Sequence, residues 1–349
     1  MIICMKQGAP REQAEHVIQA VKNSGLEPAP LFGTERTVIA VLGDERDLDI
    51  KKFQAMLGVE KVMPVLRPYR LVSRESHSGD TIIDFGNGVK VGGRNPLAIM
   101  AGPCSVETEE LMMDIAENMK KRGCQFLRGG AFKPRTGPYA FQGHGEEALK
   151  WMKRASEKTG LKIVTEVLDT QHVDMMEEYI DMYQVGARNM QNFELLKMLG
   201  KKKKPVLLKR GMSATLDEFL LAAEYIVKGG NPQIILCERG IRTFCTYSRN
   251  TLDLNVVPWI KKLSHLPIVV DPSHGTGAFD MVKPMAMAGV ACGADGLIIE
   301  VHPKPEEAWS DGDQSITYKT LDDVLMGVNL IAKALGRVEE SGRLPSLVG

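Results

Sequence analysis

Short apolar runs recur through residues 97–301, and a polar or charged residue follows each of them. The segments between the runs carry apolar residues at helical spacing, so the pattern predicts strands that alternate with helices. Eight strand–helix units within about 240 residues favour a (β/α)8 TIM barrel. We expect its helices near residues 107–122, 144–159, 169–179, 190–199, 215–228, 252–262, 279–292 and 319–336.

An open, doubly wound sheet is the alternative to a barrel. Such a sheet places a glycine-rich dinucleotide turn after its first strand. The sequence has GPCS (102–105) at this position, which lacks that glycine pattern, so we prefer the barrel. Polar residues at the carboxyl ends of barrel strands are where this fold carries its chemistry.

Residues 1–66 have a different pattern, β-α-β-β-α-β, which is that of the ferredoxin-like α+β fold. Residues 81–93 predict a β-hairpin that turns at Gly86-Asn87-Gly88, because Asn-Gly suits a tight type I′ turn. We therefore expect a small domain over 1–66, a linker and a hairpin at the barrel base over 67–96, the barrel over 97–338 and a tail over 339–349.

Composition narrows the function classes. The chain of 349 residues is 44% apolar and has zero formal net charge, so no bulk attraction to nucleic acid or to a membrane surface is expected. No apolar run approaches the ~18 residues of a membrane span, and the first residues lack the order of a signal peptide, so we expect a cytoplasmic protein. The six cysteines form no C-x-x-C pair, which argues against a zinc ribbon or a thioredoxin-like site.

Four residues of metal-ligand type follow neighbouring strands. Cys104 follows the first barrel strand, His274 the seventh and Glu300 the eighth, and Asp311 lies in the loop after the eighth. A closed barrel pairs strand eight with strand one, so these side chains can converge. Thiolate, imidazole and carboxylates together favour Mn²⁺, Fe²⁺, Co²⁺ or Zn²⁺ over Mg²⁺ or Ca²⁺. Taken alone, Cys104 is better interpreted as a buried apolar thiol and His274 could be a general base, but the placement of all four residues at adjacent strand ends favours a metal site. We also expect Cys104 to be the most reactive thiol.

Basic residues follow strands two, four, five and six. Charges at buried strand ends need partners of opposite sign. Glu166 and Glu238 can supply some of them, and Arg210 is the best candidate for a purely structural ion pair. The basic residues that remain without an internal partner suit phosphates and a carboxylate as ligands. An aromatic content of 6% argues against a groove for single-stranded nucleic acid. The basic set comprises Arg128, Lys133, Arg135, Arg188, Lys209, Arg210, Arg239 and Arg242.

The motifs around these residues resemble those of type I 3-deoxy-D-arabino-heptulosonate-7-phosphate (DAHP) synthases, in the beta branch closest to the octulosonate-phosphate synthases. The resemblance covers the whole barrel, and residues 1–66 resemble the ferredoxin-like (ACT-like) regulatory domain of some members. The motifs are GPCS (102–105), LRGGAFKPRT (127–136), GARN (186–189), LLKRG (207–211), CERGIRTF (237–244), DPSH (271–274), EVHP (300–303) and SDGDQS (310–315).

The resemblance implies a metal-dependent transferase that condenses phosphoenolpyruvate with erythrose 4-phosphate and water, the first step of the shikimate pathway. It also implies feedback inhibition by tyrosine or phenylalanine and a homotetramer. By motif, the metal ligands are Cys104, His274, Glu300 and Asp311, and the catalytic residues are Lys133, His274 and Cys104. The phosphoenolpyruvate contacts are Arg128, Lys133, Ala187, Arg188, Lys209 and Arg239, and the erythrose 4-phosphate contacts are Arg135, Thr136 and Arg242.

Three alternatives stay open at this point. An octulosonate-8-phosphate synthase uses a five-carbon acceptor, but KPRT (133–136) favours the heptulosonate synthase. A Schiff-base aldolase would use Lys209 or Lys133 as its nucleophile. A non-catalytic amino-acid-binding protein fits least, because every ligand position is filled.

Overall fold

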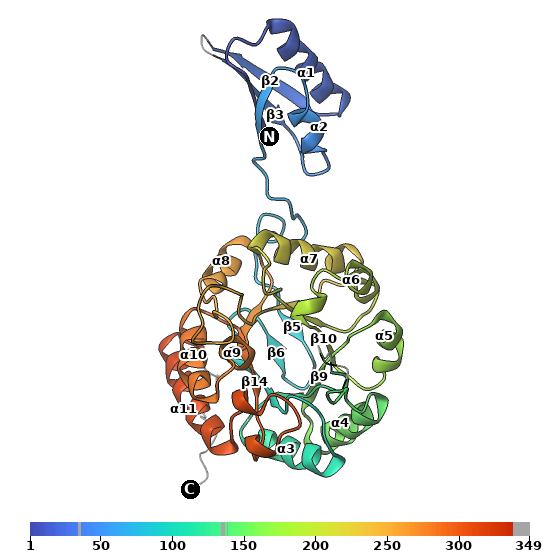
Figure 1. Cartoon of the computed structure of the whole chain (residues 1–349), viewed down its shortest axis with the longest axis vertical. Coiled ribbons are helices and arrows are strands. Elements are labelled where there is room, and N and C mark those ends of the chain that lie inside the picture. The colour runs from blue at the N-terminus through green and yellow to red at the C-terminus, as the bar shows by residue number, and fades with distance from the viewer. Residues whose placement is uncertain (34–35, 134–136, 138, 338–349) are drawn as a thin grey trace. The chain divides into compact units, whose positions relative to one another are not determined.

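The protein forms two compact units, Met1–Arg70 and Leu71–Gly349, which are described separately. Figure 1 shows a computed structural model of the chain, which describes residues 1–33, 36–133, 137 and 139–337. Arg135 and Thr136, two predicted substrate contacts, lie outside the described residues. Among the described residues, no helix combines the length and apolarity that crossing a membrane requires.

The first unit is a four-stranded antiparallel sheet in the order β2-β3-β1-β4. Alternate strand residues such as Ile3, Met5 and Ile39 are buried in one core with Val17 and Val21 of the first helix, as the period of two predicts. The ferredoxin-like prediction is thus confirmed. The elements are β1 (Ile2–Met5), α1 (Arg11–Asn23), β2 (Glu27–Phe32), β3 (Thr37–Leu42), α2 (Ile50–Gln54) and β4 (Val59–Met63).

The second unit is a closed barrel of eight parallel strands, which confirms the TIM-barrel prediction. The last strand pairs with the first in parallel, from Gly296 opposite Ala98 to Glu300 opposite Gly102. This closure places the segments that follow the two strands side by side. In chain order the strands are β7 (Ala98–Gly102), β8 (Phe126–Arg128), β9 (Lys162–Glu166), β10 (Met182–Val185), β11 (Val206–Lys209), β12 (Ile234–Glu238), β13 (Ile268–Val270) and β14 (Gly296–Glu300).

A ring of helices surrounds the barrel strands (Figure 1). Side-chain N-caps begin several of them, and Thr215 with Glu218 forms a capping box. These helices lie where the periodicity predicts them: α3 (Glu109–Lys121), α4 (Glu146–Thr159), α5 (Thr170–Met176), α6 (Phe193–Gly200), α7 (Leu216–Lys228), α8 (Val256–Leu263), α10 (Phe279–Ala291) and α11 (Tyr318–Ala334). Four short helical segments were not predicted: α9 (Pro272–Thr276), η1 (Ala187–Asn189), η2 (Pro305–Glu307) and η3 (Gly312–Gln314).

A hairpin of β5 (Ile83–Asp84) and β6 (Lys90–Val91) packs into the barrel interior. Its turn has positive φ at Asn87 (53°) and Gly88 (80°), as a type I′ turn requires. Ile83 and Val91 are buried in one core with Phe126, the first residue of β8. The hairpin therefore fills the amino-terminal end of the barrel, which leaves the carboxyl ends of the strands for the site.

Candidate active site

The carboxyl ends of the barrel strands surround a cavity of about 370 Å³ whose lining is mostly basic. Such a lining suits a ligand with several negative charges, since phosphate and carboxylate groups are the natural partners of Arg and Lys. The charged residues of the lining are Arg128, Lys133, Arg188, Lys209, Arg239, Arg242 and Arg249, with Glu166 and Asp311 as the acidic members.

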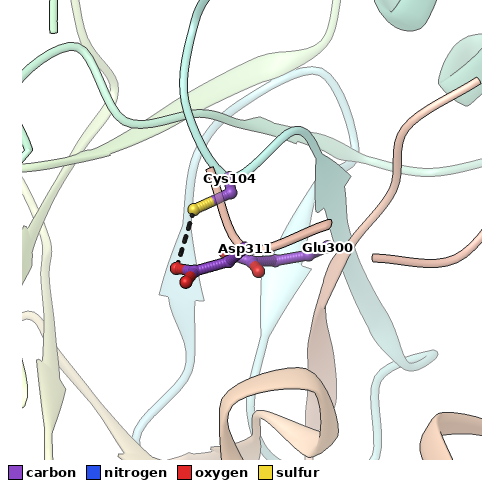
Figure 2. Close-up of side chains that lie close together, drawn as sticks. All are labelled: Cys104, Glu300 and Asp311. Carbon is purple, nitrogen blue, oxygen red and sulfur yellow. Dashed lines mark hydrogen bonds between the residues drawn. The ribbon is translucent and has the colours of Figure 1, made fainter. Parts of the chain in front are cut away.

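Three of the four predicted metal ligands lie together, and one of them, Asp311, lines this cavity. One donor atom each of Cys104, Glu300 and Asp311 lies within 4.8 Å of the other two. Figure 2 shows the Cys104 thiol turned toward the Asp311 carboxylate, and the Sγ–Oδ2 distance is 3.2 Å. Cys104 follows β7 and Glu300 ends β14, so the closing strand pair brings them together. Asp311 has φ of 48°, a left-handed conformation that is uncommon for a residue other than glycine and often marks functional sites.

His274, the fourth predicted ligand, lies beside this group without belonging to it. Its Nε2 is 3.4 Å from Glu300 Oε1, while its Nδ1 is 2.8 Å from Asp271 Oδ2. A carboxylate on Nδ1 orients the ring and leaves Nε2 available, which is the usual arrangement around a metal-binding histidine. The predicted set is therefore adjacent in space, with His274 joined through Glu300.

The short helix α9 explains how His274 reaches this place. Asp271 caps the helix by accepting from the His274 backbone N–H at 2.9 Å, and Pro272 occupies the first turn. Gly277 ends the helix in a left-handed conformation, with φ of 72°. The sequence DPSH thus encodes both the helix start and the ring orientation, and the role of Asp271 was missed in the sequence analysis.

Neighbouring donors hold the Glu300 carboxylate. Arg128 NH1 donates to Glu300 Oε1 at 2.7 Å, and Gln314 Nε2 donates to Oε2 at 2.5 Å. Burial opposes ionisation of Glu300, but the neighbouring His274 and Arg128 lower its pKa to about 2. The carboxylate is therefore ionised throughout the neutral range. Gln314, like Asp271, was not predicted.

Cys104 has the opposite behaviour. Burial, reinforced by Glu300, raises the pKa of its thiol to about 12, although Lys133 donates to Sγ at 3.0 Å. A protonated, buried thiol is a poor nucleophile, which argues against the prediction that Cys104 is the most reactive thiol. Cys245 is exposed, and hydrogen bonds from the Tyr247 backbone and from Ser248 lower its pKa.

The basic residues divide into paired and unpaired groups. Arg210 NH1 contacts Glu238 at 3.0 Å and Asp253 at 2.9 Å, which confirms its structural ion pair. Lys209 Nζ donates to Asp271 at 2.6 Å. Arg239 is buried, and its NH1 has no hydrogen-bond partner within the part of the chain that the structure describes. Burial lowers the pKa of Arg239, so its charge is held at a cost unless an anion joins it.

The remaining predicted contacts that belong to the described residues lie in the same cavity. Ala187 and Arg188 belong to η1 after β10, and Arg242 follows β12. Glu166, expected to pair with a cation, accepts a hydrogen bond from Gln184 at 3.4 Å and faces the cavity. Arg249 also lines the cavity and was not predicted, since it lies eleven residues beyond β12, where no motif marked it.

The fold and this site define a TIM-barrel enzyme that binds anions beside a cluster of metal-type donors. The chain belongs to the DAHP synthetase I family, whose sequence model matches residues 80–334. Residues 1–67 match the DAHP synthase ferredoxin-like domain.

Known proteins agree with this assignment along nearly the whole chain. The phospho-2-dehydro-3-deoxyheptonate aldolase of Thermotoga maritima is 49% identical over 96% of this chain and 99% of its own length. The crystal structure of a DAHP synthase from Thermotoga maritima has a TM-score of 0.91, with 48% identity over 96% of this chain and 98% of that one. The 2-dehydro-3-deoxyphosphooctonate aldolase of Syntrophotalea carbinolica is 31% identical over 70% of this chain and 95% of its own length.

Proposed function

We propose that the barrel mouth carries out the DAHP synthase reaction. Phosphoenolpyruvate condenses with erythrose 4-phosphate and water to give 3-deoxy-D-arabino-heptulosonate 7-phosphate and inorganic phosphate, the first step of the shikimate pathway. Family membership and the 49% identity to the Thermotoga maritima enzyme support this activity. The structural observation that carries it is a Cys104–Glu300–Asp311 donor cluster that adjoins a strongly basic cavity through Asp311.

The phosphoenolpyruvate site of this proposal is the deep basic part of the cavity. Arg239 has an unpartnered, buried NH1 that a phosphate or carboxylate oxygen would satisfy. Arg188, Lys209 and Arg128 line the same cavity, and Ala187 brings backbone close to it. Binding here neutralises the enol phosphate and directs its C3 toward the second substrate, which is the positioning that a reaction between two anions requires.

The erythrose 4-phosphate site is assigned to Arg135 and Thr136 of KPRT and to Arg242. C3 of phosphoenolpyruvate forms a bond with the aldehyde carbon, water adds to C2, and the C–O bond to phosphate then breaks. Lys133 is placed to protonate the developing alkoxide, because its Nζ lies at the donor cluster, 3.0 Å from Cys104 Sγ. Its three N–H groups allow one contact with a substrate oxygen beside the two that it makes to Cys104.

The donor cluster fits a divalent transition metal. Cys104, Glu300 and Asp311 with the adjacent His274 supply sulfur, oxygen and nitrogen donors, a mixture that favours Mn²⁺, Fe²⁺, Co²⁺ or Zn²⁺. A bound cation also offsets the cost of ionising the buried Cys104 thiol. When bound, such an ion supplies Lewis-acid chemistry for the aldehyde or for a water molecule.

A substrate-pair assay tests this function. The metal-loaded enzyme is given phosphoenolpyruvate with erythrose 4-phosphate or with arabinose 5-phosphate, and phosphate release is measured. We expect turnover with the four-carbon acceptor. A preference for the five-carbon acceptor would instead identify an octulosonate synthase, the activity named for the relative from Syntrophotalea carbinolica.

The Schiff-base alternative has little structural support. Lys209 Nζ donates to Asp271 and Lys133 Nζ donates to Cys104, so each amine would have to give up a buried contact before it attacked a substrate carbonyl. Borohydride treatment in the presence of either substrate should therefore leave no covalent adduct. An adduct on Lys133 or Lys209, found by mass spectrometry, would restore the aldolase alternative.

Residues 1–66 are proposed to be a regulatory domain that responds to tyrosine or phenylalanine in a homotetramer. The match to the DAHP synthase ferredoxin-like domain supports this, and every described residue of the candidate site lies beyond residue 100. A chain that starts at Val72 should fold, since a truncated Thermotoga maritima DAHP synthase has been solved with 49% identity over 76% of this chain.

We expect the truncated enzyme to remain active and to lose inhibition. Allosteric coupling is typically worth about 1–3 kcal/mol, or roughly 5- to 150-fold in effector response. Initial rates are measured with and without each amino acid for the full chain and for the truncated one. Full inhibition of the truncated enzyme would place the effector site in the barrel.

A further inference from the structure

Arg249 connects the basic wall of the cavity to two of the candidate metal ligands. Its NH1 donates to Gln314 Oε1 at 2.7 Å and lies 3.9 Å from Asp311 Oδ1. Gln314 in turn donates from Nε2 to Glu300 Oε2 at 2.5 Å. One guanidinium therefore reaches Asp311 directly and Glu300 through a single amide.

The amide of Gln314 has only one orientation that satisfies both neighbours. The Arg249 guanidinium can only donate, and the ionised Glu300 carboxylate can only accept. A flipped amide would face its NH2 toward the guanidinium and its oxygen toward the carboxylate. Gln314 is 2% exposed, so water does not replace a lost partner easily. Arg249 thus fixes the amide, and the amide fixes the second oxygen of Glu300.

The backbone around Arg249 is attached to the helix that carries His274. The Arg249 N–H donates to the Thr276 carbonyl at 2.9 Å, and Asn250 Nδ2 donates to the His274 carbonyl at 2.9 Å. The two residues 249–250 therefore contact the α9 segment and the loop that carries Asp311. Contacts of this kind determine how ligand side chains are presented to a metal.

We propose that Arg249 is a positioning residue that, with Gln314, sets Glu300 and Asp311 in their ligand orientation before a metal binds. Its positive charge reduces the repulsion between the two carboxylates, and its hydrogen bond fixes one of them. This inference rests on the proposed metal centre. It extends that proposal to residues outside the four ligands.

The charge of Arg249 and its positioning role predict opposite effects on metal affinity when the residue is removed. By charge alone, removal of a cation near the site strengthens the binding of a divalent metal. By positioning, removal weakens binding by about 10- to 100-fold, the usual effect of changing a group that orients metal ligands. Gln314→Leu removes the amide without a change in charge, and it should weaken binding in the same direction.

The test is a direct titration of the metal-free, full-length protein with Co²⁺ or Cd²⁺. Absorption from a thiolate–metal bond reports the Kd for wild type, R249Q, Q314L and the double variant. Arg154→Gln is the matched control, because Arg154 pairs with Glu109 on the outer helices, 2.5 Å away and outside the cavity. Thermal unfolding of each metal-free variant checks that it is folded.

We expect R249Q and Q314L each to raise the metal Kd by about 10- to 100-fold and R154Q to leave it unchanged. In the double variant, the increase in Kd should be smaller than the product of the two single increases. R249Q that binds metal as tightly as wild type, or more tightly, would overturn the proposal. Losses of metal-binding free energy that simply add in the double variant would also overturn it, because they would show that Arg249 and Gln314 act independently.

Cys104→Ser separates the two proposals: absorption that persists without the Cys104 thiol refutes the proposed metal centre itself. If R249Q fails to fold, the Kd of Q314L decides, and an unchanged value refutes the positioning role.

Discussion

The two sides of the barrel mouth differ in how their charged groups are satisfied. On the side of β14 and β7, Glu300 accepts from Arg128 and Gln314, and Cys104 accepts from Lys133. On the side of β12, the buried Arg239 NH1 has no partner among the described residues. On the first, assembled side the carboxylate and the thiol are already paired, although Arg128 Nε has no partner among the described residues, and on the second, incomplete side a buried guanidinium has a donor without its acceptor.

This difference indicates what each side binds. Buried polar groups are almost always hydrogen-bonded, so an unpartnered one points to a missing ligand. The assembled side presents two carboxylates and a thiol, which suits a cation that must find its ligands oriented. The incomplete side presents a buried guanidinium whose NH1 has no acceptor among the described residues, which suits an anionic substrate that arrives and leaves in each cycle. The two functions can therefore be separated by mutation.

The largest expected effect is loss of the cation site. Removal of the metal by chelation, or Cys104→Ala, should reduce turnover by roughly 10³-fold, since Lewis-acid stabilisation is worth several kcal/mol. Steady-state kinetics with added Mn²⁺, Co²⁺ or Zn²⁺ measure this, and readdition should restore the chelated wild type only.

Cys124→Ala is the control for this experiment. Cys124 is also buried, and burial raises the pKa of its thiol to about 12, but it lies outside the cavity and the donor cluster. Its variant should keep its turnover. Wild-type rates for metal-free Cys104→Ala would remove the metal from the mechanism.

The next largest effect is a loss of stability when Arg210, a paired cation on the incomplete side, is replaced. Arg210→Met leaves the fully buried Glu238 without the guanidinium that contacts it at 3.0 Å. Breaking a buried pair from one side costs about 3–5 kcal/mol of unfolding free energy. Denaturant unfolding of the variant measures this loss. A stable Arg210→Met that binds phosphoenolpyruvate poorly would show that Arg210 belongs with the substrate cations instead.

The sequence predicts the fold more completely than the site. Strand ends, helix starts and the Asn87-Gly88 turn follow from local periodicity and turn chemistry, and barrel closure then brings Cys104 near Glu300. The helix α9 spans only Pro272–Thr276, too short for a periodic signal, so the role of Asp271 in orienting His274 was missed.

The missed contacts have a common physical cause. Arg249 and Gln314 meet through loops whose paths depend on tertiary packing, and no spacing in the sequence encodes such a contact. The reactivity expected of Cys104 is opposed by its burial, which raises the pKa of the thiol and is not visible in a motif.

A smaller effect should come from the unpartnered cation. Arg239→Met should raise the KM for phosphoenolpyruvate by about 10- to 100-fold, because a hydrogen bond to a charged group is worth about 1.5–3 kcal/mol. The same change should stabilise the substrate-free protein by about 1–3 kcal/mol, since it removes a buried guanidinium whose NH1 has no hydrogen-bond partner among the described residues. Kinetics and thermal unfolding measure the two effects.

The opposite signs make this prediction specific to Arg239. Arg210→Met, the matched change on the same side of the mouth, should lose stability instead. A destabilised Arg239→Met with an unchanged KM would mean that Arg239 is a structural residue and that the two sides of the mouth do not differ as described.

The smallest expected effect is a difference in the rate of alkylation of two cysteines, one on each side of the mouth. Burial raises the pKa of Cys104 to about 12, so at pH 8 only about one molecule in 10⁴ carries its thiolate. Cys245, in the exposed loop after β12, has its pKa lowered by hydrogen bonds from Tyr247 and Ser248.

Iodoacetamide at pH 8 should therefore modify Cys245 first in the metal-free protein, and labelling of Cys104 should rise as the pH increases toward 12. Peptide mass spectrometry at successive times gives both rates, with the buried Cys124 as the slow reference. Labelling of Cys104 ahead of Cys245 would mean that Lys133, which donates to its sulfur, stabilises the thiolate more than burial opposes it, and the assembled side of the mouth would then hold a thiolate beside the Glu300 carboxylate before any metal binds.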